Sequence, residues 1–275
     1  MIEIGGTYDL EVVKQTDFGV FLDAGDLGEI LLPKKHTPEG LSPGDIVEVF
    51  LYTDSDDRPI ATTQVPKAEV GEFAYLEVKE NTPVGAFLDW GLDKDVLVPF
   101  AEQHRPMVVG KSYIVFLYLD KQDRITATSK IDKYVSNDPE HGFYAQQAVE
   151  LIIANSTEMG YKAIIDQSHW GLLYNDDVDE RISFGQTVQG YVKHVRVDGK
   201  IDLSLKSGQQ IRDHYSQIIE DYLRDHGGFA PVHDKSPSEQ ISDLFGMSKK
   251  QFKKAIGGLY KQKVITIEKD GIRLV

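Results

Sequence analysis

Val49-Phe50-Leu51-Tyr52 recurs letter for letter at Val115-Phe116-Leu117-Tyr118, an offset of 66 from position 49 to position 115. Three further pairs repeat at this offset: Gly19 and Gly85, Phe21 and Phe87, and Pro33 and Pro99. Two unrelated strands would not keep one register over so long a stretch, so the sequence contains a duplicated unit.

The first copy of this unit is a series of short apolar runs separated by turn residues. We expect strands at 10–14, 18–23, 29–33, 46–52 and 60–64. Strands spaced about 8–12 residues apart are typical of small barrels and sandwiches, and no helical pattern separates them as a parallel α/β fold would need. Five strands in about sixty residues favour a closed OB-type Greek-key barrel.

A third, more diverged copy follows the first two. Its strands are expected at 160–166, 171–174, 188–193 and 200–206. Asp198-Gly199 lies between the last two of these runs, and this dipeptide favours a tight two-residue hairpin. The sequence therefore predicts three tandem barrels.

The last quarter of the chain changes to helical periodicity. One face of a first helix carries Ile211, Tyr215, Ile218, Ile219 and Tyr222. A second helix is expected to begin near Ser236-Pro237 and to end at Gly246, and Ser248 is a good N-cap for a third helix. Strands at 264–268 and 272–275 predict a terminal hairpin. Three helices and a hairpin make a winged helix, whose third helix usually carries the recognition surface.

Three motifs resemble those of S1 domains, which are OB-type RNA-binding barrels. Phe18-Gly19-Val20-Phe21-Leu22-Asp23 resembles their F-G-x-F-V strand. Gly171-Leu172-Leu173-Tyr174 stands where they carry G-L-V-H, and residues 199–206 resemble their G-R-I-x-L-S-x-K ending. Three such barrels followed by a winged helix resemble the bacterial CvfB/YitL-like family of RNA-binding proteins. The most specific part of this resemblance is the stretch 245–257 of the winged helix.

The resemblance implies a multi-domain, mainly β chain of S1-like OB-type five-stranded barrels with a C-terminal α/β winged helix. It also implies a post-transcriptional influence on gene expression, including virulence genes in pathogens. We expect barrels at 1–66, 67–134 and 148–208, a linker at 135–147 and the winged-helix domain at 209–275.

The net charge of −14 is the wrong sign for a protein that approaches phosphates. Residues 209–275 contain eleven Lys and Arg against nine Asp and Glu, a net charge of +2, so the remaining residues carry −16. Six lysines follow one another in the winged helix without an intervening acid: Lys249, Lys250, Lys253, Lys254, Lys261 and Lys263. Binding to nucleic acid should therefore be local and should weaken steeply with salt.

Composition narrows the remaining function classes. The chain has no cysteine, which excludes disulfides and thiolate metal sites and fits a reducing cytoplasm. The N-terminus lacks a signal-peptide pattern, and no apolar run is long enough to span a membrane. No P-loop, H-E-x-x-H or Gly-x-Ser-x-Gly motif occurs, and the eight histidines are scattered. We expect no catalytic residues, no metal and no cofactor.

Aromatic residues on the first two barrels are candidate contacts for RNA bases. In the first copy, Val20 and Leu22 should point inward and Phe21 outward, with Phe18 just before the strand. Exposed aromatics on an OB surface stack on bases, and each contributes about 1–3 kcal/mol. Packing of Phe18 and Phe21 against a neighbouring domain or a loop is the open alternative. The second copy keeps only Phe87.

The third barrel and the winged helix supply the remaining candidates for RNA binding. They are Tyr161, Lys162, Tyr174, Lys193, Arg196, Lys206, Lys249, Lys250, Lys253 and Lys254. A solvated lysine face is the alternative for the helix, and Trp170 could plug an end of the third barrel. The pairs Asp54/Arg58 and Asp120/Arg124 are better interpreted as ion pairs of hairpin turns.

The sequence thus predicts a non-enzymatic, cytoplasmic protein that binds single-stranded RNA with low sequence specificity. Ribosomal or RNA-decay proteins are further candidate partners, no membrane is expected, and the oligomeric state is left open. Two alternatives remain. One is a duplex-DNA-binding regulator that acts through the winged helix, and the other is a scaffold whose acidic barrels dock onto proteins.

Overall fold

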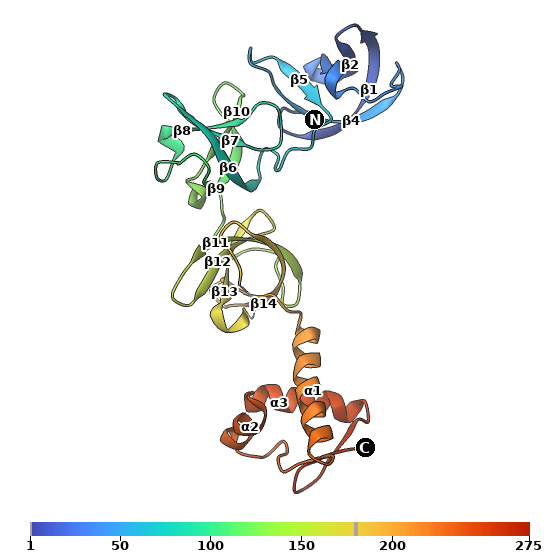
Figure 1. The fold of residues 1–275 in the computed structure, drawn as a ribbon, viewed down its shortest axis with the longest axis vertical. Helices are drawn as coiled ribbons and strands as arrows, with labels where there is room; N and C mark the ends of the chain where they lie inside the picture. The colour runs from blue at the N-terminus through green and yellow to red at the C-terminus, as the bar shows by residue number, and fades with distance from the viewer. Residues whose placement is uncertain (1, 179–180) are drawn as a thin grey trace. The chain divides into compact units, whose positions relative to one another are not determined.

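The computed structural model describes residues 2–178 and 181–275, with the side chains of Gln209 and Ile211 outside the description. The predicted place of Ile211 on the first helix face therefore lies outside the described residues. The described chain forms three closed five-stranded barrels and then a domain with three α-helices (Figure 1). The predicted fold class is confirmed.

The first barrel consists of β1 (Thr7–Thr16), β2 (Gly19–Asp23), β3 (Glu29–Pro33), β4 (Ile46–Thr53) and β5 (Pro59–Thr62). Its strand order is β1-β2-β3-β5-β4. The β3–β5 pair is parallel, whereas the other pairs are antiparallel. This is the Greek-key order of an OB barrel.

The second barrel repeats the first strand for strand. It consists of β6 (Phe73–Thr82), β7 (Gly85–Asp89), β8 (Val96–Pro99), β9 (Ser112–Leu119) and β10 (Ile125–Thr128). Gly85 pairs with Pro99 in the same register in which Gly19 pairs with Pro33. The duplication seen in the sequence is therefore a duplication of the fold.

The third barrel has the same strand order but differs from the prediction at two places. It consists of β11 (Ala148–Ser156), β12 (Gly160–Ile165), β13 (His169–Tyr174), β14 (Thr187–Val195) and β15 (Ile201–Ser204). β11 was not predicted. The predicted two-residue hairpin at Asp198-Gly199 is wrong, because the Arg196 N–H donates to the Lys200 carbonyl and encloses a longer turn, with Gly199 at φ +78°.

The winged-helix domain consists of α1 (Gly208–Asp225), β16 (Phe229–Ala230), α2 (Ser238–Phe245), α3 (Lys249–Lys261), β17 (Ile265–Ile267) and β18 (Ile272–Leu274). The strand β16 was not predicted, and it completes a sheet of order β16-β18-β17. Ser248 caps α3 as predicted, and its hydroxyl accepts from the Gln251 N–H. Gly246 ends α2 in the left-handed conformation.

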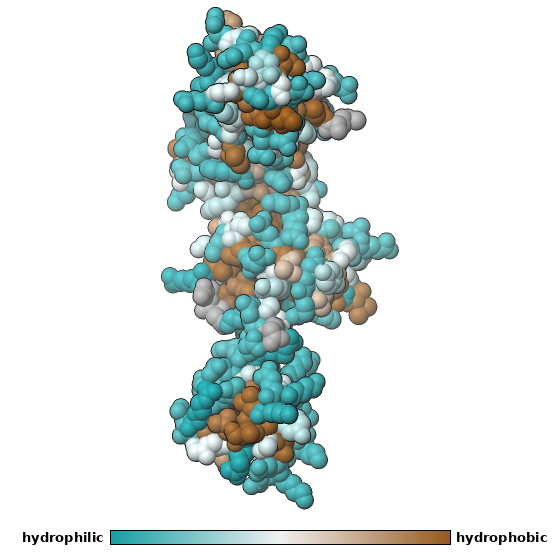
Figure 2. Space-filling model, turned by 90° about the vertical axis from the view of Figure 1, so that its right-hand side faces the viewer, coloured by the Kyte–Doolittle hydropathy of each residue, from teal (hydrophilic) through white to brown (hydrophobic). Residues whose placement is uncertain are grey.

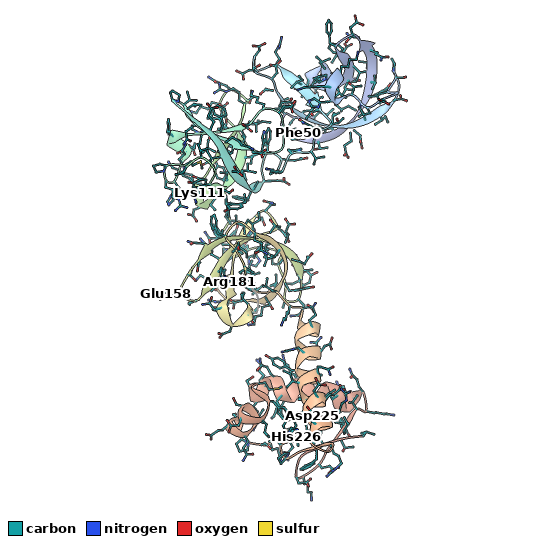
Figure 3. The ribbon with its side chains drawn as sticks, viewed as in Figure 1. Phe50, Lys111, Glu158, Arg181, Asp225 and His226 are labelled. Atoms are coloured by element: carbon teal, nitrogen blue, oxygen red, sulfur yellow. The ribbon has the colours of Figure 1, made fainter. Side chains whose placement is uncertain are left out.

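The first two barrels pack against each other through aromatic side chains. Phe50, labelled in Figure 3, meets Trp90 edge-on with ring centroids 5.6 Å apart, and both rings are buried. Beside them, the Asp93 carboxylate accepts hydrogen bonds from Lys35 and Gln64. The Lys35 hydrogen bond lowers the pKa of Asp93. Apolar burial with a polar rim fixes this junction.

The repeated phenylalanine of the second barrel has different neighbours. Phe116 lies 4.8 Å from Phe73 and stacks on Tyr134 at 4.1 Å between ring centroids. Phe73 and Phe116 belong to an apolar cluster with Ile152 of β11 and Ile164 of β12. These residues all lie in one compact unit of the chain, made of residues 1–138, 150–171 and 181–188.

A glycine opens the second strand of each of these barrels, and a larger residue would not fit there. Gly19 has φ +145°, and a Cβ built on it would lie 2.1 Å from the Leu32 carbonyl oxygen. Gly85 has φ +155° and meets the Val98 carbonyl oxygen in the same way, at 2.3 Å. Backbone thus approaches backbone where the second strand meets the third.

We predict that Gly19→Ala destabilises the first barrel by about 1–3 kcal/mol, because a residue held at an unfavourable φ costs this much even before the clash is counted. Hydrogen exchange of the β2 and β3 amides in increasing urea measures the effect. Gly142→Ala is the matched control, since Gly142 has open space around it and no positive φ. Equal exchange in both variants would contradict the proposed constraint.

Candidate nucleic-acid interface

The first barrel presents an aromatic side chain to solvent. Phe18 follows β1 and is 74% exposed, so its ring is not buried against a neighbouring domain or a loop. Val20 and Leu22 are buried while Phe21 is only half-buried, which confirms the predicted alternation along β2. One face of β2 therefore carries aromatic surface outside the barrel core.

A lysine lies over the second aromatic of this face. The Lys14 ammonium is 4.4 Å from the centroid of the Phe21 ring, in the range of a cation–π contact. Lys14 also pairs with the Glu29 carboxylate at 2.7 Å. Both groups of this ion pair are about half exposed, so it is weak enough for a phosphate to compete with it.

A surface cavity of about 340 Å³ adjoins the start of β2. Its lining residues are Gln15, Thr16, Asp17, Gly19, Val20, Lys34 and Thr37. Lys34 was not among the predicted site residues. It follows Pro33 at the end of β3. In the sequence repeat it corresponds to Phe100 of the second barrel, and the Phe100 side chain is 57% exposed. Extending the repeat by one position would have revealed both residues.

The second barrel has the same architecture with a less suitable surface. Phe87 is half-buried at the position of Phe21. Glu80 is the strand partner of Phe87, whereas Lys14 is the strand partner of Phe21. A carboxylate at this place repels phosphate, so the first barrel is the better candidate of the two.

The arginines of the β4–β5 and β9–β10 turns are engaged in ion pairs. The Arg58 side chain donates two hydrogen bonds to one Asp54 oxygen, at 3.0 and 2.8 Å, and Arg124 binds Asp120 in the same way. Burial acts to raise the pKa of Asp54, but the hydrogen bonds from Arg58 and Asp56, together with the charge of Arg58, outweigh it and lower that pKa. The pairs are hairpin-turn ion pairs, as the sequence indicated.

The predicted cations of the third barrel are mostly paired. Lys193 binds the Asp177 carboxylate at 2.6 Å, and Arg196 binds Asp202 at 2.7 Å and also the Tyr174 hydroxyl. The Lys162 ammonium lies 3.7 Å above the Trp170 ring. The remaining predicted residues, Tyr161 and Lys206, are half-buried on β12 and just after β15. The structure brings these residues into one barrel but neutralises much of their charge.

The helix α3 separates an apolar face from a basic one. Phe252, Ala255, Ile256 and Leu259 are buried in the domain core. Lys250, Lys253 and Lys254 are exposed, and none of them makes an ion pair with a described residue. Lys249 is half-buried and donates to the Lys235 carbonyl. Three predicted lysines therefore keep their charge available.

Figure 2 shows a largely hydrophilic face of the protein with smaller hydrophobic patches. Among residues 2–178 and 181–275, no cluster of three or more His, Asp or Glu side chains is placed to hold a metal ion. None of the described helices is long and apolar enough to cross a membrane.

Comparison with known proteins assigns the parts of the chain. An S1 domain family model matches residues 4–64 and 70–130, and a CvfB-like winged helix domain model matches residues 217–274. The first two barrels are therefore S1 domains, and the last domain is a winged helix. Both are nucleic-acid-binding folds.

Similar chains occur in bacteria. The chain is 30% identical to the uncharacterized protein YitL of Bacillus subtilis over 272 residues, which are 94% of this chain and 89% of YitL. It is 28% identical to conserved virulence factor B of Staphylococcus aureus strain N315, over 85% of this chain and 81% of that protein. A Streptococcus pneumoniae crystal structure, described as a multidomain protein with nucleic acid binding domains, is 26% identical, with coverages of 99% and 98% and a TM-score of 0.41.

We predict that Arg58→Ala raises the pKa of Asp54, because the two side-chain hydrogen bonds and the positive charge of Arg58 are lost, while the backbone N–H groups of residues 56 and 58 still donate to Asp54. A lowered pKa in the folded state contributes stability above the unfolded value, and this contribution disappears as the pH falls through the folded value. The free energy of unfolding of the variant should therefore be lower than that of the parent at neutral pH, and the two values should converge in acid. Carboxyl NMR titration measures the pKa, and an unchanged value would contradict the ion-pair assignment.

Proposed function

Because the chain belongs to the family of YitL and conserved virulence factor B, we propose that it binds single-stranded RNA through its S1-type barrels and its winged helix. Binding has low sequence specificity, since stacking on an aromatic ring tolerates every base. The role is post-transcriptional regulation of gene expression in the cytoplasm. The name of the Staphylococcus aureus relative supports an effect on virulence genes.

The observation that carries this proposal is the exposure of Phe18. An aromatic ring that is 74% exposed at the start of an S1-barrel strand offers a flat surface for an unpaired base. Bases of a duplex are already stacked on one another and cannot use such a platform. The nearby Lys14 and Lys34 supply positive charge for the phosphates.

The lysines of α3 support the electrostatic part of the proposal. Lys250, Lys253 and Lys254 have no described acidic partner, so their charge is available to a phosphate backbone. The rest of the chain is acidic, with a net charge of −14 overall. Attraction is therefore confined to local patches, and the protein as a whole repels nucleic acid at long range.

The same lysines favour one alternative, a regulator that binds duplex DNA. In helix-turn-helix proteins the corresponding helix enters the major groove. The proposal of RNA binding differs from this alternative in giving the barrels a direct part in binding. Both the RNA-binding proposal and the DNA-binding alternative describe a protein without catalytic function. Both also allow ribosomal or RNA-decay proteins as partners.

We predict that Phe18→Ala weakens binding to a labelled single-stranded RNA by about 5- to 150-fold, the range expected when a stacking contact of about 1–3 kcal/mol is lost. Fluorescence anisotropy at low salt measures the affinity. Phe18→Tyr is the matched control and should bind as the parent does, because it keeps the ring. The exposed position means that neither variant should change the unfolding midpoint. Unchanged affinity of the alanine variant would remove Phe18 from the interface.

We also predict that replacing Lys249, Lys250, Lys253 and Lys254 together by Ala reduces the slope of log affinity against log salt by about 2, because the phosphate contacts of the three exposed lysines on a single strand are lost. The matched control replaces four exposed lysines near or in the second barrel, namely Lys67, Lys79, Lys111 and Lys121. It changes the net charge equally and should leave the slope nearly unaltered.

Parallel titrations with duplex DNA separate the alternatives. Tighter binding to the duplex, lost in the α3 variant, would replace the RNA proposal by the DNA-binding regulator. Absence of binding to both nucleic acids at low salt would favour the protein-docking scaffold.

A further inference from the structure

A cleft separate from the Phe18 face lies within the compact unit that contains the second barrel and part of the third. Its volume is about 410 Å³. Three aromatic side chains line it: Tyr113 of β9, Trp170 of β13 and Phe184. Their positions in the sequence are far apart, so packing of the barrels forms this cleft.

Cations lie beside these aromatic side chains. The Arg105 guanidinium carbon is 5.6 Å from the centroid of the Tyr113 ring, and Arg105 makes no ion pair with a described residue. The Lys162 ammonium lies 3.7 Å above the Trp170 ring. The acid within the described lining is Asp132, which is 3.5 Å from Lys162 and highly exposed. The cleft therefore favours an anion over a cation.

The indole N–H of Trp170 lacks a hydrogen-bond acceptor within the described part of the protein. Among the described residues, its indole Nε1 is buried and has no hydrogen-bond partner. A buried donor without an acceptor costs free energy, and an acceptor supplied by a ligand would recover it. The Lys162 stem is flexible, so the ammonium can move from the ring face toward an incoming phosphate.

We infer that this cleft binds one nucleotide, with its base against the Trp170 and Phe184 rings and its phosphate near Arg105 and Lys162. Small-ligand sites begin at about 300 Å³, so the cleft has room for one such unit but not for a longer segment. Base stacking on aromatic rings and charge-assisted hydrogen bonds from a guanidinium to phosphate are the interactions that recognise a nucleotide.

The nucleotide has two sources, a free nucleoside monophosphate or a single residue of a bound RNA strand. For the second source, the inference rests on the RNA binding proposed above. For the first source it does not, because a free nucleotide would use the cleft whether or not the Phe18 face and α3 bind RNA. The two sources share one recognition chemistry and are separated by the ligands used in the test.

The chain offers its own reporter for the test. It contains two tryptophans, and Trp90 is buried between the first and second barrels. In a Trp90→Phe background, the fluorescence of Trp170 reports on the cleft. This background is titrated separately with uridine 5′-monophosphate, adenosine 5′-monophosphate and a single-stranded oligouridylate. Circular dichroism confirms that the variant is folded.

Arg105→Ala is the decisive variant, and Lys121→Ala is its matched control. Both remove one exposed positive charge from the second barrel, but Lys121 lies in the β9–β10 turn, outside the lining of the cleft. We expect a saturable change in Trp170 fluorescence whose affinity falls about tenfold or more in Arg105→Ala, as for loss of a hydrogen bond to a charged group. Lys121→Ala should behave as the parent.

The outcomes separate the inference from the proposed function. A response to a monophosphate assigns the cleft to the free nucleotide, and a response to the oligouridylate alone assigns it to one residue of an RNA strand. Anisotropy of a labelled RNA with Arg105→Ala in the wild-type background gives the same comparison without the Trp90 substitution.

One outcome is that RNA binds in the anisotropy assay while no ligand changes the fluorescence of Trp170 and Arg105→Ala leaves the RNA affinity unchanged. In that case the cleft inference is wrong and the proposed function stands. If a monophosphate binds and RNA does not, the proposed function is wrong and the cleft inference stands. If nothing binds in either assay, both are wrong.

Discussion

The fold depends on a close approach of two backbones at the start of the second strand in the first two barrels. Gly19 and Gly85 occupy this place in the two S1 domains, and the space that a Cβ would need is taken by a carbonyl oxygen of the third strand. Gly160 has a similar positive φ of +153° in the third barrel. Glycine is the residue that accepts this conformation without strain, so it recurs where sequence identity elsewhere is lost.

Closure of the barrel also decides which side chains become available for binding. Alternate residues of β2 point into the core, and burial of Val20 and Leu22 directs Phe21 to the outside. Phe18 stands before the strand begins and is left in solvent. The aromatic surface proposed to bind bases is therefore a direct result of the alternation that builds the core.

Charge is distributed so that positive side chains are mostly paired on the barrels and less so on α3. Lys14, Lys193 and Arg196 each lie against a carboxylate. Lys253 and Lys254 have no such partner among the described residues. Partial neutralisation would weaken each proposed contact with phosphate but leaves the aromatic surfaces unaffected, which fits the proposed binding of an acidic protein through small patches.

The sequence by itself determined the duplication, the barrel strands of the first copy and the helices of the winged helix, because each depends on local periodicity or on capping and turn residues. The strand β16 was missed because two residues are too short for a periodic pattern, and β11 was missed because its continuous apolar run resembles a buried helix as much as a strand.

Only the tertiary structure decided which neighbours a residue contacts when the same short sequence occurs twice. Phe50 and Phe116 stand in identical tetrapeptides, yet Phe50 packs on Trp90 and Phe116 stacks on Tyr134. The same holds for the cleft of Arg105 and Trp170, whose walls meet only when the barrels pack together. Local pattern fixes which side of a strand a residue faces, but contacts between domains depend on the packing of surfaces that are distant in the sequence.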